Sequence, residues 1–117
     1  ELKAMDAMED ATGAGRGYGV AGGVACAIVE CIRKYYPGTE VKIEHAESLA
    51  ECKKMLLLAK AGKKNGCLIE GMACPGGCIA GAGTNISVAQ AAKAVAKFKA
   101  EAKEAVPEEP VTGEKTE

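Results

Sequence analysis

The chain has 117 residues, of which 48% are hydrophobic and 26% are charged, and this composition is typical of one globular domain. Fifteen Lys and Arg residues against sixteen Asp and Glu residues leave a net charge of -1, which gives no reason to expect nucleic acid or an anionic membrane as a partner. The sequence contains no apolar run of the roughly 18 residues that a membrane-spanning helix needs.

The first 23 residues predict two segments without extended regular structure. Residues 1–11 are expected to form a short lead-in that is helical or frayed. They lack the charged start and apolar middle of a signal peptide and do not begin with Met, so we expect a cytoplasmic fragment of a longer protein or a processed product. The stretch from Thr12 to Gly23 has six glycines in twelve positions, which predicts a loop with close backbone approaches.

A helix is predicted after this loop, because apolar residues recur at the spacing of one helical face until Pro37 and Gly38 stop it. Residues 41–44 then alternate between apolar and polar, as a short strand does. The predicted face of the helix consists of Val24, Ala27, Ile28, Cys31, Ile32 and Tyr35.

A second helix is predicted to begin at Ser48, because Ser48 and Glu51 have the spacing of a capping box. Residues 67–69 follow it as a short apolar strand. A strand, a helix and a strand at this spacing predict two parallel strands joined by a right-handed crossover. The apolar side of the second helix is predicted to comprise Leu49, Cys52, Met55, Leu56, Leu58 and Ala59.

The last helix is predicted to begin at a second capping box, formed by Ser87 and Gln90. Residues 105–117 are rich in Pro, Glu, Thr and Lys, and we expect them to form a disordered tail. Residues 12–104 would then form one α/β lobe, in which a small parallel sheet with a βαβ unit is flanked by helices. The buried face of the last helix is predicted to consist of Val88, Ala91, Ala92, Val95, Phe98 and Ala102.

Two of the six cysteines, Cys74 and Cys78, enclose the segment Pro75-Gly76-Gly77. Without a secretion signal a reducing compartment is expected, where free thiols and metal ligands are more frequent than disulfides. The spacing predicts the start of a helix, with both sulfurs on one side, Pro75 in the first position and N–H groups that favour negative charge. Because thiolates bind metal and the glycines leave room for a bulky inorganic body, the motif favours two thiolates that hold an electron-rich cluster.

Two other interpretations of this cysteine pair stay open. The pair could be structural cysteines in a tight turn, although Pro and two Gly between them favour the cluster. A zinc site is also possible, but zinc sites usually combine one cysteine pair with a second pair of ligands, and no second pair is obvious in the sequence.

The segment from Glu70 to Cys78 reads EGMACPGGC and is followed by Gly81-Ala82-Gly83. It resembles the third cysteine motif of the iron-iron hydrogenases, which usually reads EVMACPGGC before a glycine-rich stretch. Upstream, the segment from Tyr18 to Val24 is similar to the FGxTGGV motif of that family. The resemblance runs from about residue 13 to about residue 103, and it implies that the chain is the C-terminal part of a larger hydrogenase-like domain.

In that family the active-site cluster joins a 4Fe-4S cubane to a two-iron unit. The resemblance implies that Cys74 would bind the cubane, and that Cys78 would bridge the cubane to the two-iron unit. Met72 would pack near the two-iron unit. The opposite wall of the pocket would be lined by Tyr18, Gly19 and Val24.

The resemblance also implies partners and an activity. The parent protein would reduce protons to hydrogen reversibly, with a ferredoxin-type electron carrier. The family's upstream motifs TSCxP and MPC are missing here, so the remaining part of the hydrogenase domain would supply the other ligands. We therefore expect the isolated chain to be inactive and to bind no cluster.

Departures from the family pattern indicate a divergent branch and leave two alternatives open. Gly71 stands where Val is usual, and Tyr18 and Ala21 stand where Phe and Thr are common. One alternative is a non-catalytic, hydrogenase-like iron-sulfur assembly protein, although that group usually reads CPSGC where this chain has CPGGC. The other alternative is a hydrogen-sensing regulator built on the same site.

Three further features favour ordinary structural roles. The remaining cysteines are expected to pack as small apolar residues, with Cys26 off the main apolar face of its helix. The stretch from Gly17 to Gly22 matches GxGxxG, with Glu44 at roughly the distance expected in a dinucleotide fold, but no strand precedes it, so nucleotide binding is not favoured. His45, the only histidine, is expected at the end of the first strand and on the surface. The other three cysteines are Cys31, Cys52 and Cys67.

Overall fold

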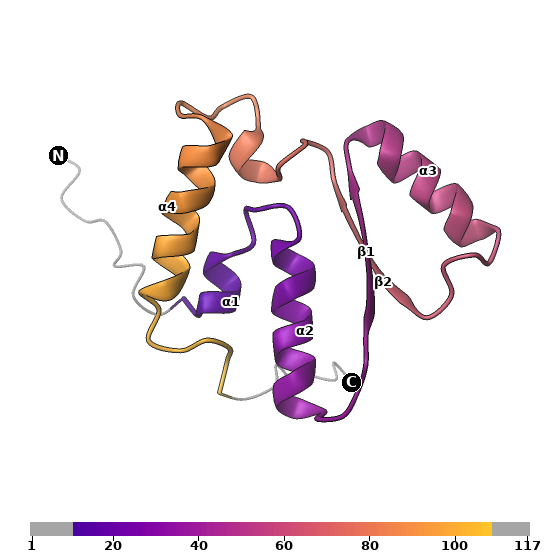
Figure 1. The fold of residues 1–117 in the computed structure, drawn as a ribbon, viewed down its shortest axis with the longest axis horizontal. Helices are drawn as coiled ribbons and strands as arrows, with labels where there is room; N and C mark the ends of the chain where they lie inside the picture. The colour runs from indigo at the N-terminus through magenta and orange to yellow at the C-terminus, as the bar shows by residue number, and fades with distance from the viewer. Residues whose placement is uncertain (1–10, 109–117) are drawn as a thin grey trace, which may run out of the picture.

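The computed structural model describes residues 11–108, so residues 1–10 of the predicted lead-in and residues 109–117 of the predicted tail lie outside the described range. Figure 1 shows α2 and α3 on opposite sides of the two strands, with α1 and α4 beyond α2. None of the helices in residues 11–108 is long and apolar enough to cross a membrane. In chain order the elements are α1 (Gly13–Arg16), α2 (Gly23–Tyr35), β1 (Lys42–Glu47), α3 (Leu49–Lys60), β2 (Cys67–Met72), the 3-10 helix η1 (Cys78–Ala80) and α4 (Val88–Ala100).

The sheet confirms the predicted α/β class. Strands β1 and β2 are parallel, and their register runs from Lys42 opposite Cys67 to Glu47 opposite Met72. Both strands extend beyond the predicted segments, residues 41–44 and 67–69, because each continues through residues that pair across the sheet. Helix α3 connects them, so the predicted βαβ unit is present, and β2 ends directly before the cysteine motif.

Helix α3 begins where the capping pattern predicts, but the box closes differently. The Ser48 side chain accepts the N–H of Glu51 at 3.4 Å. The Glu51 carboxylate accepts the N–H of Glu47 at 2.9 Å instead of that of Ser48, because the Ser48 N–H donates to the carbonyl of Met72 at 2.8 Å. The start of α3 is therefore tied to the end of β2.

The predicted apolar side of α3 is wrong for Leu49 and Leu56, which are 74% and 66% exposed. Leu57 is exposed as well. A sheet of two strands covers only a narrow stripe of a helix, and the residues that face it are half-buried. These residues are Cys52, Met55, Leu58 and Ala59.

Helix α2 is present as predicted, yet its buried positions are Ala25, Ala27 and Val29, whereas Ile28 is exposed. The helix contacts both α1 and β2, so more than one of its sides is covered. A single helical face is therefore a poor description of what α2 buries. The core around it is built from small side chains such as Ala14, which lets these elements approach closely.

The glycine segment does not start as a loop, because Gly13–Arg16 forms the helical turn α1. The Thr12 hydroxyl accepts the N–H of Gly15 at 3.2 Å and caps this turn. At its other end, the Arg16 guanidinium lies 4.3 Å from the centre of the Phe98 ring and donates to the Phe98 carbonyl at 3.1 Å. Contacts with α4 thus stabilise a turn that glycine content alone disfavours.

Helix α4 begins with the complete capping box of Ser87 and Gln90, as predicted. Ala91 is buried, but Val88 is exposed, so the prediction is wrong for Val88. Ala102 is half-buried, although it lies beyond the end of the helix.

The residues that follow α4 are hydrogen-bonded to the start of the lobe. The N–H groups of Gly13 and Ala14 each donate at 2.7 Å, to the carbonyls of Glu104 and Ala105. The Pro107 carbonyl accepts from the Lys34 ammonium at 2.6 Å and also from the Tyr35 hydroxyl. The first residues of the segment predicted as a tail therefore lie against α1 and α2.

Candidate functional site

A cavity of about 500 Å³ lies at the C-terminal end of β2. In parallel α/β sheets, ligands commonly bind beyond the carboxyl ends of the strands. All six site residues that the sequence analysis names line this one cavity. Its lining consists of Tyr18, Gly19, Val24, Gly71, Met72, Ala73, Cys74 and Cys78.

The cysteine motif is a turn and does not begin an α-helix, so this part of the sequence prediction is wrong. Gly76 and Gly77 have φ angles of 97° and 91°, which lie in the left-handed region and break a right-handed helix. Only the short 3-10 helix η1 follows, and it starts at Cys78. The expected N-terminal N–H groups are already used, because Gly76 donates to the Glu47 carboxylate at 2.6 Å and Gly77 donates to the Cys74 carbonyl at 2.9 Å.

The glycine loop, residues 17–22, is joined by backbone hydrogen bonds to the cysteine loop, residues 73–77, and to η1. The N–H of Ala21 donates to the Gly76 carbonyl at 3.1 Å, and the N–H of Ile79 donates to the Gly19 carbonyl, also at 3.1 Å. A Cβ at Gly77 would lie 2.5 Å from the backbone nitrogen of Ala21. The space at Gly77 therefore serves the contact between the two loops, and not the clearance for a cluster that the sequence analysis expects.

The two motif cysteines are free thiols that border the cavity together. Cys74 is half-buried just beyond β2, whereas Cys78 is exposed at the start of η1. Both residues therefore border the same cavity.

The other four cysteines do not line this cavity. The Cys52 thiol lies between the carbonyls of Ala46 and Met72, at 3.6 and 3.7 Å. Cys31 and Cys67 are half-buried and Cys26 is exposed, so the expected core packing holds only in part. Within the described range no cluster of three or more Cys, His, Asp or Glu residues could hold a metal ion.

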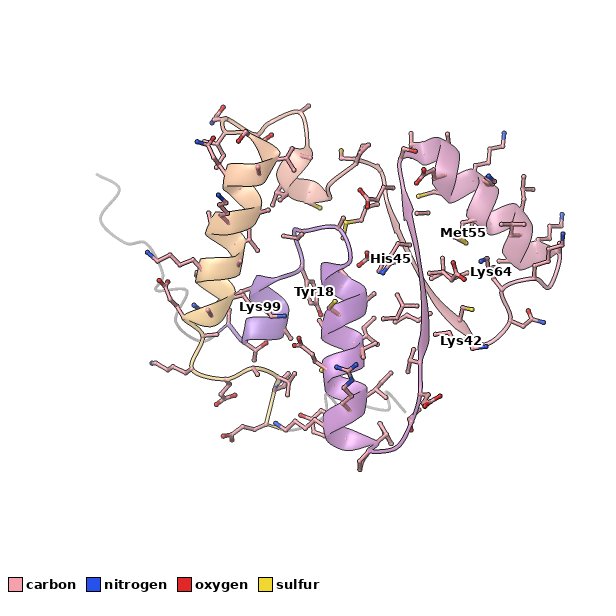
Figure 2. All side chains as sticks on the ribbon, viewed as in Figure 1. Tyr18, Lys42, His45, Met55, Lys64 and Lys99 are labelled. Atoms are coloured by element: carbon pink, nitrogen blue, oxygen red, sulfur yellow. The ribbon has the colours of Figure 1, made fainter. Side chains whose placement is uncertain are left out.

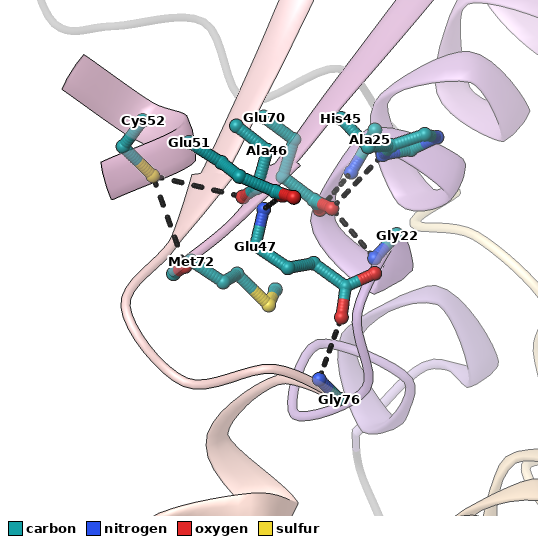
Figure 3. A network of polar contacts seen from close by, with 10 residues as sticks. All are labelled: Gly22, Ala25, His45, Ala46, Glu47, Glu51, Cys52, Glu70, Met72 and Gly76. Atoms are coloured by element: carbon teal, nitrogen blue, oxygen red, sulfur yellow. Dashed lines mark hydrogen bonds and ion pairs between the residues drawn. The ribbon is translucent and has the colours of Figure 1, made fainter. Parts of the chain in front are cut away.

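Glu70 is a buried carboxylate beside the cavity, and the sequence analysis gives it no role. It accepts the N–H of Gly22 at 2.6 Å, the N–H of Ala25 at 3.0 Å and a hydrogen bond with His45 Nδ1 at 3.2 Å (Figure 3). Burial raises the pKa of Glu70. The N–H groups of Ala25 and Gly22, together with His45, lower the pKa by more than burial raises it, so that it lies below its ordinary value. The carboxylate is therefore held in its charged form at the N-terminus of α2.

His45 lies within β1, and not at the end of the strand as the sequence analysis expects. Its ring points from β1 toward α2 (Figure 2), where it meets Glu70, its partner in the strand register. The side chain is 46% exposed and does not line the cavity. The contact with Glu70 gives His45 a structural role.

The geometry gives no support to a nucleotide site at the GxGxxG pattern. Helix α1 precedes the glycine loop, where a dinucleotide fold requires a strand. The acidic residue that would bind a ribose, Glu44, instead forms an ion pair with Lys64 at 2.7 Å.

Comparison with known proteins identifies the family. Residues 1–82 match the iron-only hydrogenase large subunit, C-terminal domain. The matched range contains the glycine loop, the βαβ unit and both motif cysteines, whereas α4 lies outside it. A search of curated proteins finds no match. Because the matched range covers more than half of the chain, this protein belongs to the family of the iron-only hydrogenase large subunit, C-terminal domain.

Proposed function

We propose that this chain supplies one part of the active-site pocket of an iron-only hydrogenase, with Cys74 and Cys78 as thiolate ligands of its iron-sulfur group. The observation that carries the proposal is the shared cavity at the end of β2. Residues from the glycine loop, from β2 and from the cysteine loop border it together, although they lie far apart in the sequence.

The donor chemistry of the cavity fits one half of such a group. Cysteine thiolates are the usual ligands of iron-sulfur clusters, and the rest of the lining is glycine, apolar side chains and Tyr18. A cubane takes four ligands, and Cys74 and Cys78 are two. The remaining ligands would therefore come from the rest of the hydrogenase domain, which is the first partner that the function requires.

The bound group would supply the electron transfer that interconverts protons and hydrogen. The residues of this chain would have simpler tasks. Cys74 and Cys78 would hold the group, while Met72 and Val24 would exclude water from it. The bonds between the two loops would keep these walls together. A ferredoxin-type carrier is the electron partner that suits this chemistry.

The conformation of Gly76 supports the hydrogenase over the assembly protein. Assembly proteins usually have serine at the position of Gly76. Here the φ angle of Gly76 is 97°, and a Cβ would lie 3.0 Å from Val88 Cγ1 and 3.2 Å from Ala80 Cβ. A serine would be strained in this turn, so the loop is built for the glycine of the hydrogenase pattern.

One experiment separates the candidate functions. The chain is produced with the rest of the hydrogenase domain and with hydrogenase maturation factors, and hydrogen evolution from a reduced dye is measured beside the infrared spectrum. A hydrogenase gives carbon monoxide and cyanide bands together with hydrogen evolution. A sensor gives the bands with little turnover. A plain cubane without these bands would contradict the proposal and favour an assembly protein.

The chain alone gives a second test of the ligand count. After anaerobic reconstitution with iron and sulfide, we expect less than one cluster per chain, because two thiolates leave a cubane half-ligated. A stable four-iron cluster on the isolated chain would contradict the assignment, since it would require ligands among the other cysteines.

A further inference from the structure

The side chain of Glu70 caps α2 from the neighbouring strand. Gly22 is the N-cap residue of α2 and has no side chain with which to cap it. Glu70 replaces that cap with both oxygens, since Oε1 accepts the N–H of Ala25 and Oε2 accepts the N–H of Gly22. A carboxylate in this place is also stabilised by the positive end of the helix dipole.

A second carboxylate makes the matching contact with the cysteine loop. Glu47 is the last residue of β1 and lies opposite Met72 in the register. Its Oε2 accepts the N–H of Gly76 at 2.6 Å, as Figure 3 shows. The two strands thus send one carboxylate to each of the loops that border the cavity.

Beside the backbone hydrogen bonds that join them, these loops have few large side chains to hold their positions. The glycine loop and the cysteine loop are built largely from glycine and alanine, which bring little side-chain packing. A glycine-rich backbone also loses the most conformational freedom on ordering. Hydrogen bonds to buried or half-buried carboxylates are therefore the contacts best suited to fix such loops.

We propose that Glu70 and Glu47 are positioning residues that set the two walls of the cavity, Glu70 through the glycine loop and Glu47 through the cysteine loop. Neither carboxylate lines the cavity, so we assign both a positioning role and not a ligand role. The role in holding an iron-sulfur group rests on the proposed function, but the role in fixing the loops does not.

The two carboxylates differ in whether a glutamine could keep their hydrogen bonds. Glu70 accepts N–H groups with both oxygens, so Glu70→Gln would bring an amide NH₂ against a backbone N–H and lose at least one bond. Glu47 meets Gly76 through one oxygen, and the amide oxygen of Glu47→Gln would keep that bond. Conservative substitution should therefore disturb the glycine loop and spare the cysteine loop.

Amide hydrogen exchange on the iron-free 117-residue chain tests this directly. In Glu70→Gln, we expect exchange at Gly22 and Ala25 to rise at least about tenfold, and by clearly more than exchange at the amides of β1 and β2. Glu44→Gln is the matched control, because it removes a carboxylate from the same strand pair without touching either loop. Protection at Gly22 and Ala25 equal to that of the wild type, or a loss there no larger than the loss across the sheet, would overturn the role of Glu70.

Variants of Glu47 test the proposal independently if Glu70→Gln fails to fold. Glu47→Ala should raise exchange at Gly76 by a similar factor, and Glu47→Gln should restore protection there. Equal exchange in Glu47→Ala and the wild type would overturn the role of Glu47.

The loaded protein then gives a separate readout. In Glu70→Gln, the infrared bands should shift or broaden while the iron content stays the same. Unchanged bands would overturn the link between the carboxylates and the bound group. If the wild type itself has no such bands, the proposed function fails, and the exchange result still decides whether the carboxylates fix the loops.

Discussion

A side chain at position 77 would occupy the space of Ala21, because a Cβ built on Gly77 would lie 2.5 Å from the Ala21 backbone nitrogen. The same Cβ would lie 2.6 Å from the Gly19 carbonyl oxygen. At Gly77 the cysteine loop and the glycine loop therefore touch backbone to backbone. This close contact is what turns two distant motifs into the walls of one cavity.

We expect Gly77→Ala to destabilise the chain strongly. A non-glycine residue with a φ angle near 91° costs about 1–3 kcal/mol by itself, and the contact with Ala21 adds to this. The free energy of unfolding, measured by urea titration, should fall by more than about 2 kcal/mol.

Gly83→Ala is the matched control for that substitution. A Cβ at Gly83 would meet no atom within 4 Å. Its unfolding free energy should stay within about 0.5 kcal/mol of the wild type. Similar losses in both variants would mean that glycine content, and not the contact between the loops, determines stability here.

Gly71 stands where the family usually has valine, and the neighbouring Cys52 explains this difference. A Cβ on Gly71 would lie 3.1 Å from Cys52 Sγ, so the thiol already fills the space of that side chain. We expect Gly71→Ala to lower the unfolding free energy by roughly 1 kcal/mol in the presence of Cys52, and by less in Cys52→Ala. A double-mutant cycle measures the coupling, which should exceed about 0.5 kcal/mol. Additive effects of the two substitutions would show that they do not compete for space.

The stability of the chain should depend on pH through Glu70. Its folded-state pKa lies below the ordinary value of 4.5, so its contribution to stability is present above about pH 4.5 and is lost as the pH falls through the lower folded-state pKa. Unfolding free energies measured between about pH 6 and pH 3 should therefore fall more steeply in the wild type than in Glu70→Gln. His45 is the titratable side chain that faces Glu70. The unfolding free energy of His45→Gln should therefore be measured over the same pH range. Parallel curves for the wild type and Glu70→Gln would contradict this contribution.

Local patterns in the sequence predict most of the elements, and the resemblance to the hydrogenase motifs predicts the residues of the cavity. The capping box of Ser87 and Gln90 marks the start of α4, and the apolar run after Cys67 marks β2. Parallel pairing of β1 and β2 then brings the cysteine motif to the end of the sheet. These features depend on residues that are close in sequence or on the general rules of βαβ units.

The errors arise where distant residues decide the conformation. The turn α1 depends on Phe98 of α4, and the φ angles of Gly76 and Gly77 follow from the approach of the glycine loop. Glu70 binds backbone N–H groups that lie 48 and 45 residues away, and such groups leave no trace in the sequence. A carboxylate directly after the apolar run of residues 67–69 is a signal that could have indicated its role.

Cys74 and Cys78 are the proposed ligands of the iron-sulfur group. The most direct test is the infrared spectrum and the iron content of Cys78→Ala and Cys74→Ala in the matured protein, with Cys26→Ala as the control because Cys26 is an exposed thiol outside the cavity. We predict that both cavity variants lose the carbon monoxide and cyanide bands and that the control keeps them. Full bands and full iron content in Cys78→Ala would contradict the claim.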